Sequence, residues 1–541
     1  MNELPDLRLH WIDGAIIIAY LLMLIAVGIY HSRRPGDMRD FFLAGSNVKW
    51  LAMGLSLMAA LNSGIDYLMQ PSAIIRFGLF AAIGSLSWLV IYPYVFHIVL
   101  PLYRRLQAVS VYEYLEHRFD LRVRLLAAGI FLLWRFGWMA TALYVPSLAI
   151  SVATGGRISV EALIMVIGCV VTIYTMLGGI RAVIWNDVFQ FWLMALGLGT
   201  TIAICIANVE GGVAGILAQL RAVGTDAPTS APAGASGFLS FFFVPMTYAG
   251  MLISVIVARL GQFTSDQVMV QRMQTARSIQ DARRGFLVNA VSDTIWMLAL
   301  CFVGLALYAY FQSRFGQLPA WAMDKPDQIF PYFMSLVFPI GLVGLVIAAI
   351  LAASISSIDS ALNSLTSVVM VDFVQRLFWK QDPAREDNAN DQKKRVLASR
   401  LVNVAVGVIG VAISMNVAAL GSLLEIANKI INSFAGPILG IYLLGMFSRR
   451  AHSLGVLVGG VVGTCITLYV AFQGQIHGLL NRSFGLGWTE SLLISFLWTS
   501  TFGLVATLFI GVVASIVLRR PRQDPAEAWI WASVVKRELK E

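Results

Sequence analysis

Two adjacent serines, Ser356 and Ser357, lie within a long apolar stretch of the sequence. In a helix their hydroxyls stand about one turn beyond the carbonyl of Ala353, so the three residues can present oxygen atoms together. Several oxygen ligands are what a hard cation such as Na⁺ prefers. The hydroxyls can instead bond back to carbonyls four residues earlier or allow close helix packing. The spacing alone leaves both interpretations open.

Ionisable residues also occur within the apolar stretches, where they are costly and therefore indicate function. Structural ion pairing is the competing interpretation for each, and it is favoured for Glu425 and Lys429, which are four residues apart. For Asp187 and Asp359, cation binding and ion pairing are equally good interpretations. The full set is Asp66, Asp187, Asp293, Asp359, Glu425, Arg135, Arg259 and Lys429.

The composition indicates that a lipid bilayer surrounds these residues. Of 541 residues, 58% are hydrophobic and only 13% are charged, and apolar runs of about 20 residues recur from Trp11 to Arg519. The net charge of +9 comes from Lys and Arg in short loops, which is typical of membrane topology and does not indicate nucleic-acid binding. The first run follows a mildly acidic segment, so we expect a retained helix and no signal peptide.

The apolar runs predict an all-α integral membrane protein with about thirteen transmembrane helices. Because the loops rich in Lys and Arg are expected to be cytoplasmic, the N-terminus is predicted outside and the C-terminus inside. The ninth span is long enough to include a non-spanning extension. The tail after Arg522 carries Trp529 and Trp531 among charges and is expected on the inner leaflet. The spans are expected near residues 11–30, 49–76, 79–103, 123–152, 158–178, 182–207, 237–262, 284–313, 331–373, 397–416, 419–447, 453–473 and 491–518.

Two of these spans are expected to be broken helices. The second contains the small and polar run Ala59–Asp66 followed by Pro71, where a lipid-facing helix would carry Leu and Ile. A break at membrane depth is tolerated only where the freed backbone groups are buried in protein or line a cavity, so the carbonyls of Ala59 and Asn62 could face a cation. The seventh span is expected to break as well, at the positions Pro245, Gly250, Arg259, Gly261 and Gln262.

The two broken spans are five apart, as a five-plus-five repeat requires. In transporters built from inverted repeats, interrupted spans at corresponding positions are the best pointer to the binding site. We therefore expect the solute and ion sites at these two breaks.

Three motifs are spread along almost the whole chain: Gly178–Gln190, Ser265–Arg272 with Ala282–Gly285, and Ala435–Phe447. They closely resemble the signatures of the sodium:solute symporters, the family of the sodium/glucose, sodium/proline and sodium/iodide carriers. Within that family, the residues Pro71-Ser72, Arg76–Gly78 and Val111–Phe119 look most like the iodide, monocarboxylate and multivitamin branch.

The resemblance implies a leucine-transporter-like core with a 5+5 inverted repeat, formed by the second to eleventh spans. The implied divisions are a flanking helix and cytoplasmic loop at 1–48, a first repeat at 49–207, an external loop at 208–236, a second repeat at 237–447, two flanking helices at 448–518 and a cytoplasmic tail at 519–541.

The resemblance also implies two sodium sites. Matched residue by residue, the family's conserved site falls on the carbonyls of Ala59, Asn62 and Ala353 and the hydroxyls of Ser356 and Ser357. A second site found in some relatives falls on Asp187, Ser356, Asp359 and Ser360, with Asp359 standing where those relatives carry a hydroxyl.

Substrate positions of sugar-carrying relatives match Asp66, Arg259 and Lys429, where those relatives have polar amides, so a sugar is not expected. An Arg or Lys in a dry cavity binds an anion, and Arg can hold a carboxylate through two hydrogen bonds. Asp66 would then neutralise one cation or bind the ammonium group of a zwitterion. Further candidates around the solute are Ser63, Trp134, Trp138 and Tyr248.

The expected function is import of a small organic solute, carboxylate-bearing or anionic, with Na⁺ as the coupling ion and alternating access as the mechanism. We expect a multi-pass plasma-membrane protein, or a bacterial inner-membrane one, with no catalytic role and no obligate protein partner. The alternatives are a transporter-like solute sensor, a symporter of a zwitterionic amino acid or other solute, a channel, and a membrane enzyme. Proton coupling through Asp66 or Asp187 stays open.

Overall fold

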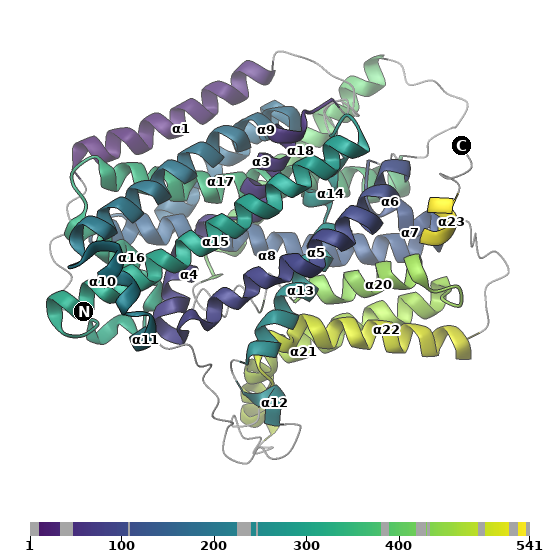
Figure 1. Ribbon diagram of the computed structural model, residues 1–541. Helices are drawn as coiled ribbons and strands as arrows, with labels where there is room; N and C mark the ends of the chain where they lie inside the picture. The colour runs from purple at the N-terminus through teal and green to yellow at the C-terminus, as the bar shows by residue number, and fades with distance from the viewer. Residues whose placement is uncertain are drawn as a thin grey trace.

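The computed structural model describes residues 10–32, 47–106, 109–223, 240–244, 247–379, 389–417, 429, 433–484, 493–518 and 529–536. Over these ranges the chain is almost entirely helical, and its β-type pairing is an isolated bridge between Val48 and Ala276. Helices run side by side along most of the molecule (Figure 1). Pro245 and Glu425 lie outside the described residues.

Eight helices among the described residues are long and apolar enough to cross a membrane, or nine spans if a bent pair counts as one. Large apolar side chains face outward from them, such as Leu89 at 77% exposure and Phe509 at 68%. Such a surface is stable in hydrocarbon and not in water, so the prediction of an integral membrane protein is confirmed. The count of thirteen spans and the orientation of the termini stay predictions.

The second span is broken, as predicted. Helix α3 (Trp50–Leu61) and helix α4 (Gly64–Phe77) meet at an angle of 59°. Asn62 is extended at the end of α3. Ser63 begins α4 in a capping box, in which the Ser63 side chain accepts a backbone N–H and the Asp66 side chain accepts the N–H of Ser63 at 2.7 Å. The capping residues therefore create the break.

The seventh span is also interrupted. Val244 and Thr247, on either side of the predicted position Pro245, are not helical, and a further interruption lies beyond the predicted positions. Helix α13 (Tyr248–Ser265) is continuous through Arg259, Gly261 and Gln262. The later interruption, the second break, is at Asp266, whose backbone is extended and whose side chain caps helix α14 (Gln267–Gln274) through the N–H of Val268. A capping Asp ends one helix and starts another more effectively than glycines inside a helix do.

The central helix of the bundle is α17 (Leu342–Val368), which continues as the π-helix η6 (Val369–Phe378). In its most apolar 18-residue stretch, 83% of the residues are buried. The helix is buried because it packs against α1 (Trp11–Ser32), α3, α8 (Leu121–Ala153) and α9 (Val160–Asn208) (Figure 1). The short helix α16 (Ile329–Val337) precedes it and corresponds to the predicted non-spanning extension.

Helix α9 contains both the fifth and the sixth expected spans. Its 49 residues correspond to about 74 Å at 1.5 Å per residue, more than twice the thickness of the hydrocarbon layer. Its two apolar stretches are Val160–Met176 and Val183–Asn208.

The last two long helices pack through a seam of small residues. In α21 (Ser453–Phe484), a Cβ added to Gly459 would lie 2.7 Å from Gly511 of α22 (Thr499–Val517). A Cβ on Gly463 would lie 1.9 Å from the Thr507 hydroxyl. Small residues that allow backbones to approach this closely are typical of helix pairs in membranes. Helix α20 (Ala435–Phe447) lies beside both of them (Figure 1).

The remaining elements complete the bundle and its ends. They are α15 (Ile279–Phe315), η2 (Leu79–Ser87), α5 (Trp88–Tyr94), η3 (Val95–Val99), α6 (Leu100–Leu106), α7 (Glu113–Arg118), α10 (Gly212–Ala218), α11 (Leu220–Val223), α12 (Ser240–Phe243), η4 (Ala320–Ala322), η5 (Pro326–Gln328), α18 (Ala389–Ser414), η10 (Phe496–Trp498) and α23 (Trp531–Lys536).

The C-terminal segment packs on the protein. The ring of Trp529 stacks on His117 of α7 with centroids 4.7 Å apart. The indole of Trp531 donates to the carbonyl of Ile98 at 3.2 Å. Both tryptophans therefore contact protein groups, and the position of the tail on the inner leaflet stays a prediction.

Candidate functional site

The hydroxyl of Ser356 joins the central helix to the broken one. Its Oγ atom lies 2.9 Å from the carbonyl oxygen of Ala59, in the last turn of α3, and 2.8 Å from that of Ala353. All three residues are fully buried. The predicted oxygen ligands Ala59, Ala353 and Ser356 are therefore within contact distance of one another.

Ser357 provides a test of whether these groups fit a cation. Its hydroxyl is buried and has no hydrogen-bond partner within the described part of the chain. A buried hydroxyl without a partner is unfavourable, and an ion or a water would satisfy it. Hydroxyl and carbonyl oxygens are the kind of ligand that Na⁺ prefers, so the chemistry of these groups fits a cation. Asn62 is buried at the same break.

The residues of the second predicted sodium site also lie together. Asp187 of α9 accepts hydrogen bonds from Ser56 at 2.5 Å and from Arg272 of α14 at 2.9 Å. Its other carboxylate oxygen is buried and has no partner among the described residues. Asp359 of α17 accepts a hydrogen bond from Tyr174, and its Oδ1 atom lies 3.2 Å from the Ser360 hydroxyl oxygen.

Hydrogen bonds of Ser360 connect this second cluster with the residues around Ser356. Ser360 donates to the carbonyl of Ser356 and accepts from Arg272. Two carboxylates and one guanidinium give the cluster a formal charge of −1 when all are ionised, so a bound cation would balance it. Ser56, Tyr174 and Arg272 were not predicted as site residues, because nothing in their spacing along the chain connects them with Asp187 or Asp359.

A third group of buried polar residues surrounds the predicted substrate residue Arg259. The Nη2 atom of Arg259 is 2.8 Å from Asp293 of α15, and the guanidinium lies over the ring of Trp88, 4.7 Å from its centroid. Asp293 also accepts from the indole of Trp88 at 2.6 Å and from the amide of Asn62 at 2.9 Å. Asp66 is close enough to interact electrostatically with both Asp293 and Arg259.

The other predicted solute contacts are more dispersed. Ser63 and Asp66 form the capping box of α4, so they lie at the break. Trp138 and Trp134 stand against Arg135, with its guanidinium carbon 5.0 and 5.3 Å from the two ring centroids, and Arg135 pairs with Asp266 at the second break.

The remaining two candidates are Tyr248 and Lys429. Tyr248 begins α13 and is 44% exposed. The backbone carbonyl of Lys429 accepts a hydrogen bond from Ser433.

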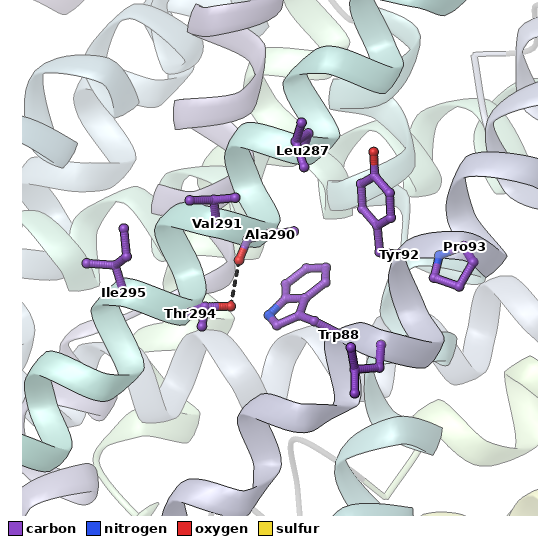
Figure 2. Close-up of a pocket in the computed structure, with 9 residues that line it drawn as sticks. Trp88, Tyr92, Pro93, Leu287, Ala290, Val291, Thr294 and Ile295 are labelled. Atoms are coloured by element: carbon purple, nitrogen blue, oxygen red, sulfur yellow. Dashed lines mark hydrogen bonds between the residues drawn. The ribbon is translucent and has the colours of Figure 1, made fainter.

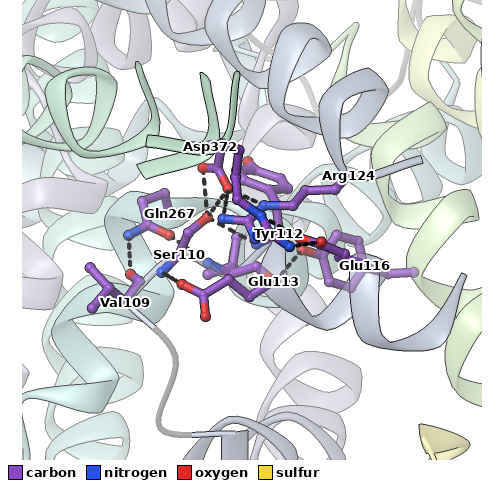
Figure 3. Close-up of polar contacts among 11 residues, drawn as sticks. Val109, Ser110, Tyr112, Glu113, Glu116, Arg124, Gln267 and Asp372 are labelled. Atoms are coloured by element: carbon purple, nitrogen blue, oxygen red, sulfur yellow. Dashed lines mark hydrogen bonds and ion pairs between the residues drawn. The ribbon is translucent and has the colours of Figure 1, made fainter. Parts of the chain in front are cut away.

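A separate polar network ties the end of the ninth span to neighbouring segments (Figure 3). Arg124 of α8 binds Asp372 and Glu116, each at 2.6 Å, and the hydroxyl of Ser110 donates to Asp372. The side chain of Gln267, in the helix after the second break, donates to the carbonyl of Val109 and accepts from the backbone N–H of Val111. The network was missed in sequence because its members come from four distant segments.

A shallow apolar groove of about 430 Å³ lies between α5 and α15 (Figure 2). Trp88 lies at one side of it, while its indole N–H contacts Asp293. The groove is lined by Trp88, Leu89, Tyr92, Pro93, Leu287, Ala290, Val291, Thr294 and Ile295.

A broken helix whose Ala59 carbonyl meets the Ser356 hydroxyl of a buried neighbour, beside clusters of buried charge, is typical of secondary transporters that contain broken helices. The model of the sodium:solute symporter family matches residues 41–463. The chain belongs to the sodium:solute symporter family. It is a multi-pass plasma-membrane protein that couples solute transport to Na⁺, as the sequence motifs predicted.

Individual relatives cover most of the chain. A sodium/sialic acid symporter of Proteus mirabilis is 32% identical, over 87% of this chain and 92% of that protein. The sodium-coupled monocarboxylate transporter 1 of Homo sapiens is 27% identical, over 86% of this chain and 74% of that protein. The monocarboxylate branch that the sequence indicated is thus among the relatives.

Solved structures agree in fold. The substrate-bound outward-open state of a Na⁺-coupled sialic acid symporter, described as revealing a novel Na⁺ site, matches with a TM-score of 0.78 and 28% identity, covering 95% of this chain and all of that one. A nucleobase-cation-symport-1 family transporter matches with a TM-score of 0.52 and 14% identity, covering 88% and 93% of the two chains. The leucine-transporter-like fold is confirmed.

Proposed function

We propose that this protein imports a small carboxylate-bearing solute together with Na⁺, and that Na⁺ binds where α3 breaks beside α17. The observation that carries the proposal is the position of Ser356 between the carbonyls of Ala59 and Ala353, at 2.9 and 2.8 Å. The proposed ligands are the carbonyls of Ala59, Asn62 and Ala353 and the hydroxyls of Ser356 and Ser357.

The ion would act on the two helices that it joins. Carbonyls at the end of α3 and hydroxyls of α17 share the ion, so its binding favours the state in which these helices are in contact. A membrane potential adds about 2.3 kcal/mol per charge per 100 mV to inward movement of the cation. Release of the ion inward would loosen the contact and let the solute leave.

A second Na⁺ is proposed at Asp187, Ser356, Asp359 and Ser360. The support is the formal charge of −1 in this cluster and the buried carboxylate oxygen of Asp187 that has no partner among the described residues. Since Ser360 donates to the Ser356 carbonyl, occupation of one site would stabilise the other.

The solute is proposed to bind at the first break, with Arg259 as its anion-binding residue and with Ser63, Asp66, Trp138, Tyr248 and Lys429 as further contacts. Relatives named for sialic acid and for monocarboxylates both carry carboxylates, which supports an acidic solute here. The two repeats would be residues 49–207 and 237–447, each containing one of the two spans predicted to be broken.

A zwitterionic solute is the second candidate. The observation that favours it is that Arg259 lies among two carboxylates, Asp293 at 2.8 Å and Asp66 within electrostatic range. Such surroundings accept a solute that brings a cationic group along with its carboxylate.

The test is uptake into proteoliposomes that contain the purified protein. Labelled sialic acid, short monocarboxylates, amino acids and sugars are supplied under an inward gradient of Na⁺, K⁺ or H⁺. Accumulation of an acid with Na⁺ alone is expected, and accumulation of an amino acid would select the zwitterionic alternative. If no solute accumulates under any gradient, the sensor interpretation replaces transport. A catalytic role is not proposed, because the family consists of transporters.

A further inference from the structure

Asp293 is a buried carboxylate with donors from three different segments. It receives the Asn62 amide from the break of the second span at 2.9 Å, the Trp88 indole from α5 at 2.6 Å and the Arg259 guanidinium from α13 at 2.8 Å. Its side chain is 1% exposed. A buried carboxylate with three charge-assisted or polar donors is held in one orientation.

Arg259 uses only part of its guanidinium in this arrangement. Its Nη2 atom pairs with Asp293, whereas Nη1 is buried and has no hydrogen-bond partner in the described part of the chain. An unpaired guanidinium nitrogen in a buried position is a vacant donor for an anion. Asp293 therefore fixes which half of the guanidinium is free.

Asn62 connects this arrangement with the break. The backbone of Asn62 supplies one of the proposed sodium ligands, while its side chain donates to Asp293. An ion that holds the Asn62 backbone also holds the amide that orients Asp293. The chain of contacts then runs from the break through Asn62 and Asp293 to Arg259.

We propose that Asp293 is the positioning residue that links Na⁺ binding at the break of the second span to the presentation of Arg259 to the solute. The inference rests on the proposed function, because it takes the sodium ligands and the role of Arg259 from there. Asp293 does not bind the solute in this view; it sets the orientation of the residue that does. A variant that lacks the Asp293 carboxylate should therefore still bind the solute, but its affinity for the solute should no longer depend on Na⁺.

The experiment measures the KM of the full-length protein in proteoliposomes at low and at saturating Na⁺. The solute is the acid that the uptake assay selects from sialic acid and the short monocarboxylates. In the wild type, KM is expected to fall at least tenfold as Na⁺ rises. In Asp293→Asn, which keeps the size of the side chain and loses its charge, KM is expected to change less than twofold.

The matched control is Asp372→Asn, which removes the charge of another buried carboxylate paired with an arginine, at 2.6 Å from Arg124. It is expected to keep the tenfold ratio, even if Vmax falls. Structural damage lowers Vmax without changing the KM ratio, so the ratio separates positioning from stability.

Two further variants protect the test. Trp88→Phe removes one donor to Asp293 and keeps all charges, and it should reduce the KM ratio to about threefold. Asn62→Ala removes the amide donor and keeps the backbone carbonyl. The double variant Asn62→Ala with Asp293→Asn should have the same KM ratio as Asp293→Asn alone, because both substitutions act through one contact.

A wild-type KM that is the same at low and at saturating Na⁺ would contradict the proposed function itself. A full tenfold ratio in both Asp293→Asn and Trp88→Phe would overturn only the role of Asp293.

Discussion

Ser356 and Ser357 are neighbours with different energetic roles. The Ser356 hydroxyl already bonds carbonyls of two helices, so its loss would weaken the contact between α3 and α17 as well as an ion site. The Ser357 hydroxyl is buried with no partner among the described residues, which costs about 1–3 kcal/mol when nothing binds there. Ser357 is therefore the better residue for testing ion binding alone.

Substitution Ser357→Ala is expected to weaken Na⁺ binding at least tenfold, or about 1.4 kcal/mol, without lowering stability in Na⁺-free buffer. The measurement is the thermal midpoint of the purified protein against Na⁺ concentration, with choline as the replacement ion. Ser367→Ala is the control, since Ser367 is on the same helix and its hydroxyl is also buried without a partner in the described chain. An unchanged Na⁺ midpoint in Ser357→Ala would exclude this hydroxyl as a ligand.

Asp187 allows the number of ions to be tested. Asp187→Asn changes the formal charge of the Asp187–Asp359–Arg272 cluster from −1 to 0, which removes the reason for a cation there. We expect the Hill coefficient of Na⁺-dependent uptake to fall from about 2 toward 1. Unchanged cooperativity in a variant that still transports would argue against a second ion at this cluster.

At the scale of elements, the contact between α4 and α17 depends on Gly64. A Cβ at this position would lie 2.2 Å from the Ser354 hydroxyl and 2.8 Å from the Ile350 carbonyl. Gly64 is the first residue of α4, so any displacement moves the break itself.

Gly64→Ala is expected to cost about 1–3 kcal/mol of stability through overpacking and to weaken Na⁺ binding, because the start of α4, and with it the break, is pushed away from α17. Thermal midpoints with and without Na⁺ give both quantities. Gly129→Ala is the control, since a Cβ at Gly129 meets nothing within 4 Å and alanine favours a helix. Equal behaviour of the two variants would show that the close approach at Gly64 does not matter.

The sequence predicted the first break well and the second less well. Small and polar residues at Ala59–Asp66 mark the first break directly, because a lipid-facing helix excludes them. The break of the seventh span was expected at Pro245, Gly250, Arg259, Gly261 and Gln262. The chain is non-helical on either side of Pro245, whereas the two glycines lie inside α13, because glycine is tolerated in a helix that has neighbours to pack against. The residue that marks the second break is the capping residue Asp266. It was not recognised as a cap, because an Asp within a family motif can equally be interpreted as an ionisable site residue.

At the scale of the whole molecule, the C-terminal segment closes over one end of the bundle. Trp529 stacks on His117, Trp531 donates to Ile98, and the hydroxyl of Tyr114 donates to the carbonyl of Trp529 at 3.1 Å. These contacts join the tail to helices of the first predicted repeat.

Replacement of both tryptophans by alanine should therefore destabilise the protein. Each buried Trp→Ala change costs about 3–5 kcal/mol in a core, and partial exposure reduces that figure. The apparent Tm of the detergent-solubilised protein is expected to fall by several degrees, at about 2–4 °C per kcal/mol. Trp192→Ala, at a side chain that is 62% exposed, should leave the Tm nearly unchanged. Equal Tm values would place the tail on the lipid after all.

Polar contacts between residues far apart in the chain could not be predicted from the sequence. The spans, the membrane environment and the proposed ligands Ala59, Ala353 and Ser356 follow from local pattern and from motifs. The partners of Arg259 and Asp187 do not, because Asp293 and Arg272 are 34 and 85 residues away in the chain and become neighbours only when helices pack. Charge balance in a dry interior selects such pairs, and a linear pattern does not record it.

The glycine seam between α21 and α22 has a practical consequence for the study of transport. Two helices whose backbones touch through Gly459, Gly463 and Gly511 cannot slide or part without losing the contact along its whole length. Probes on their outer faces, for example at Tyr469 and Phe509, which are 42% and 68% exposed, would keep a fixed separation throughout the cycle. The distance between these two probes can therefore serve as an internal reference for spectroscopic distances measured between helices that move.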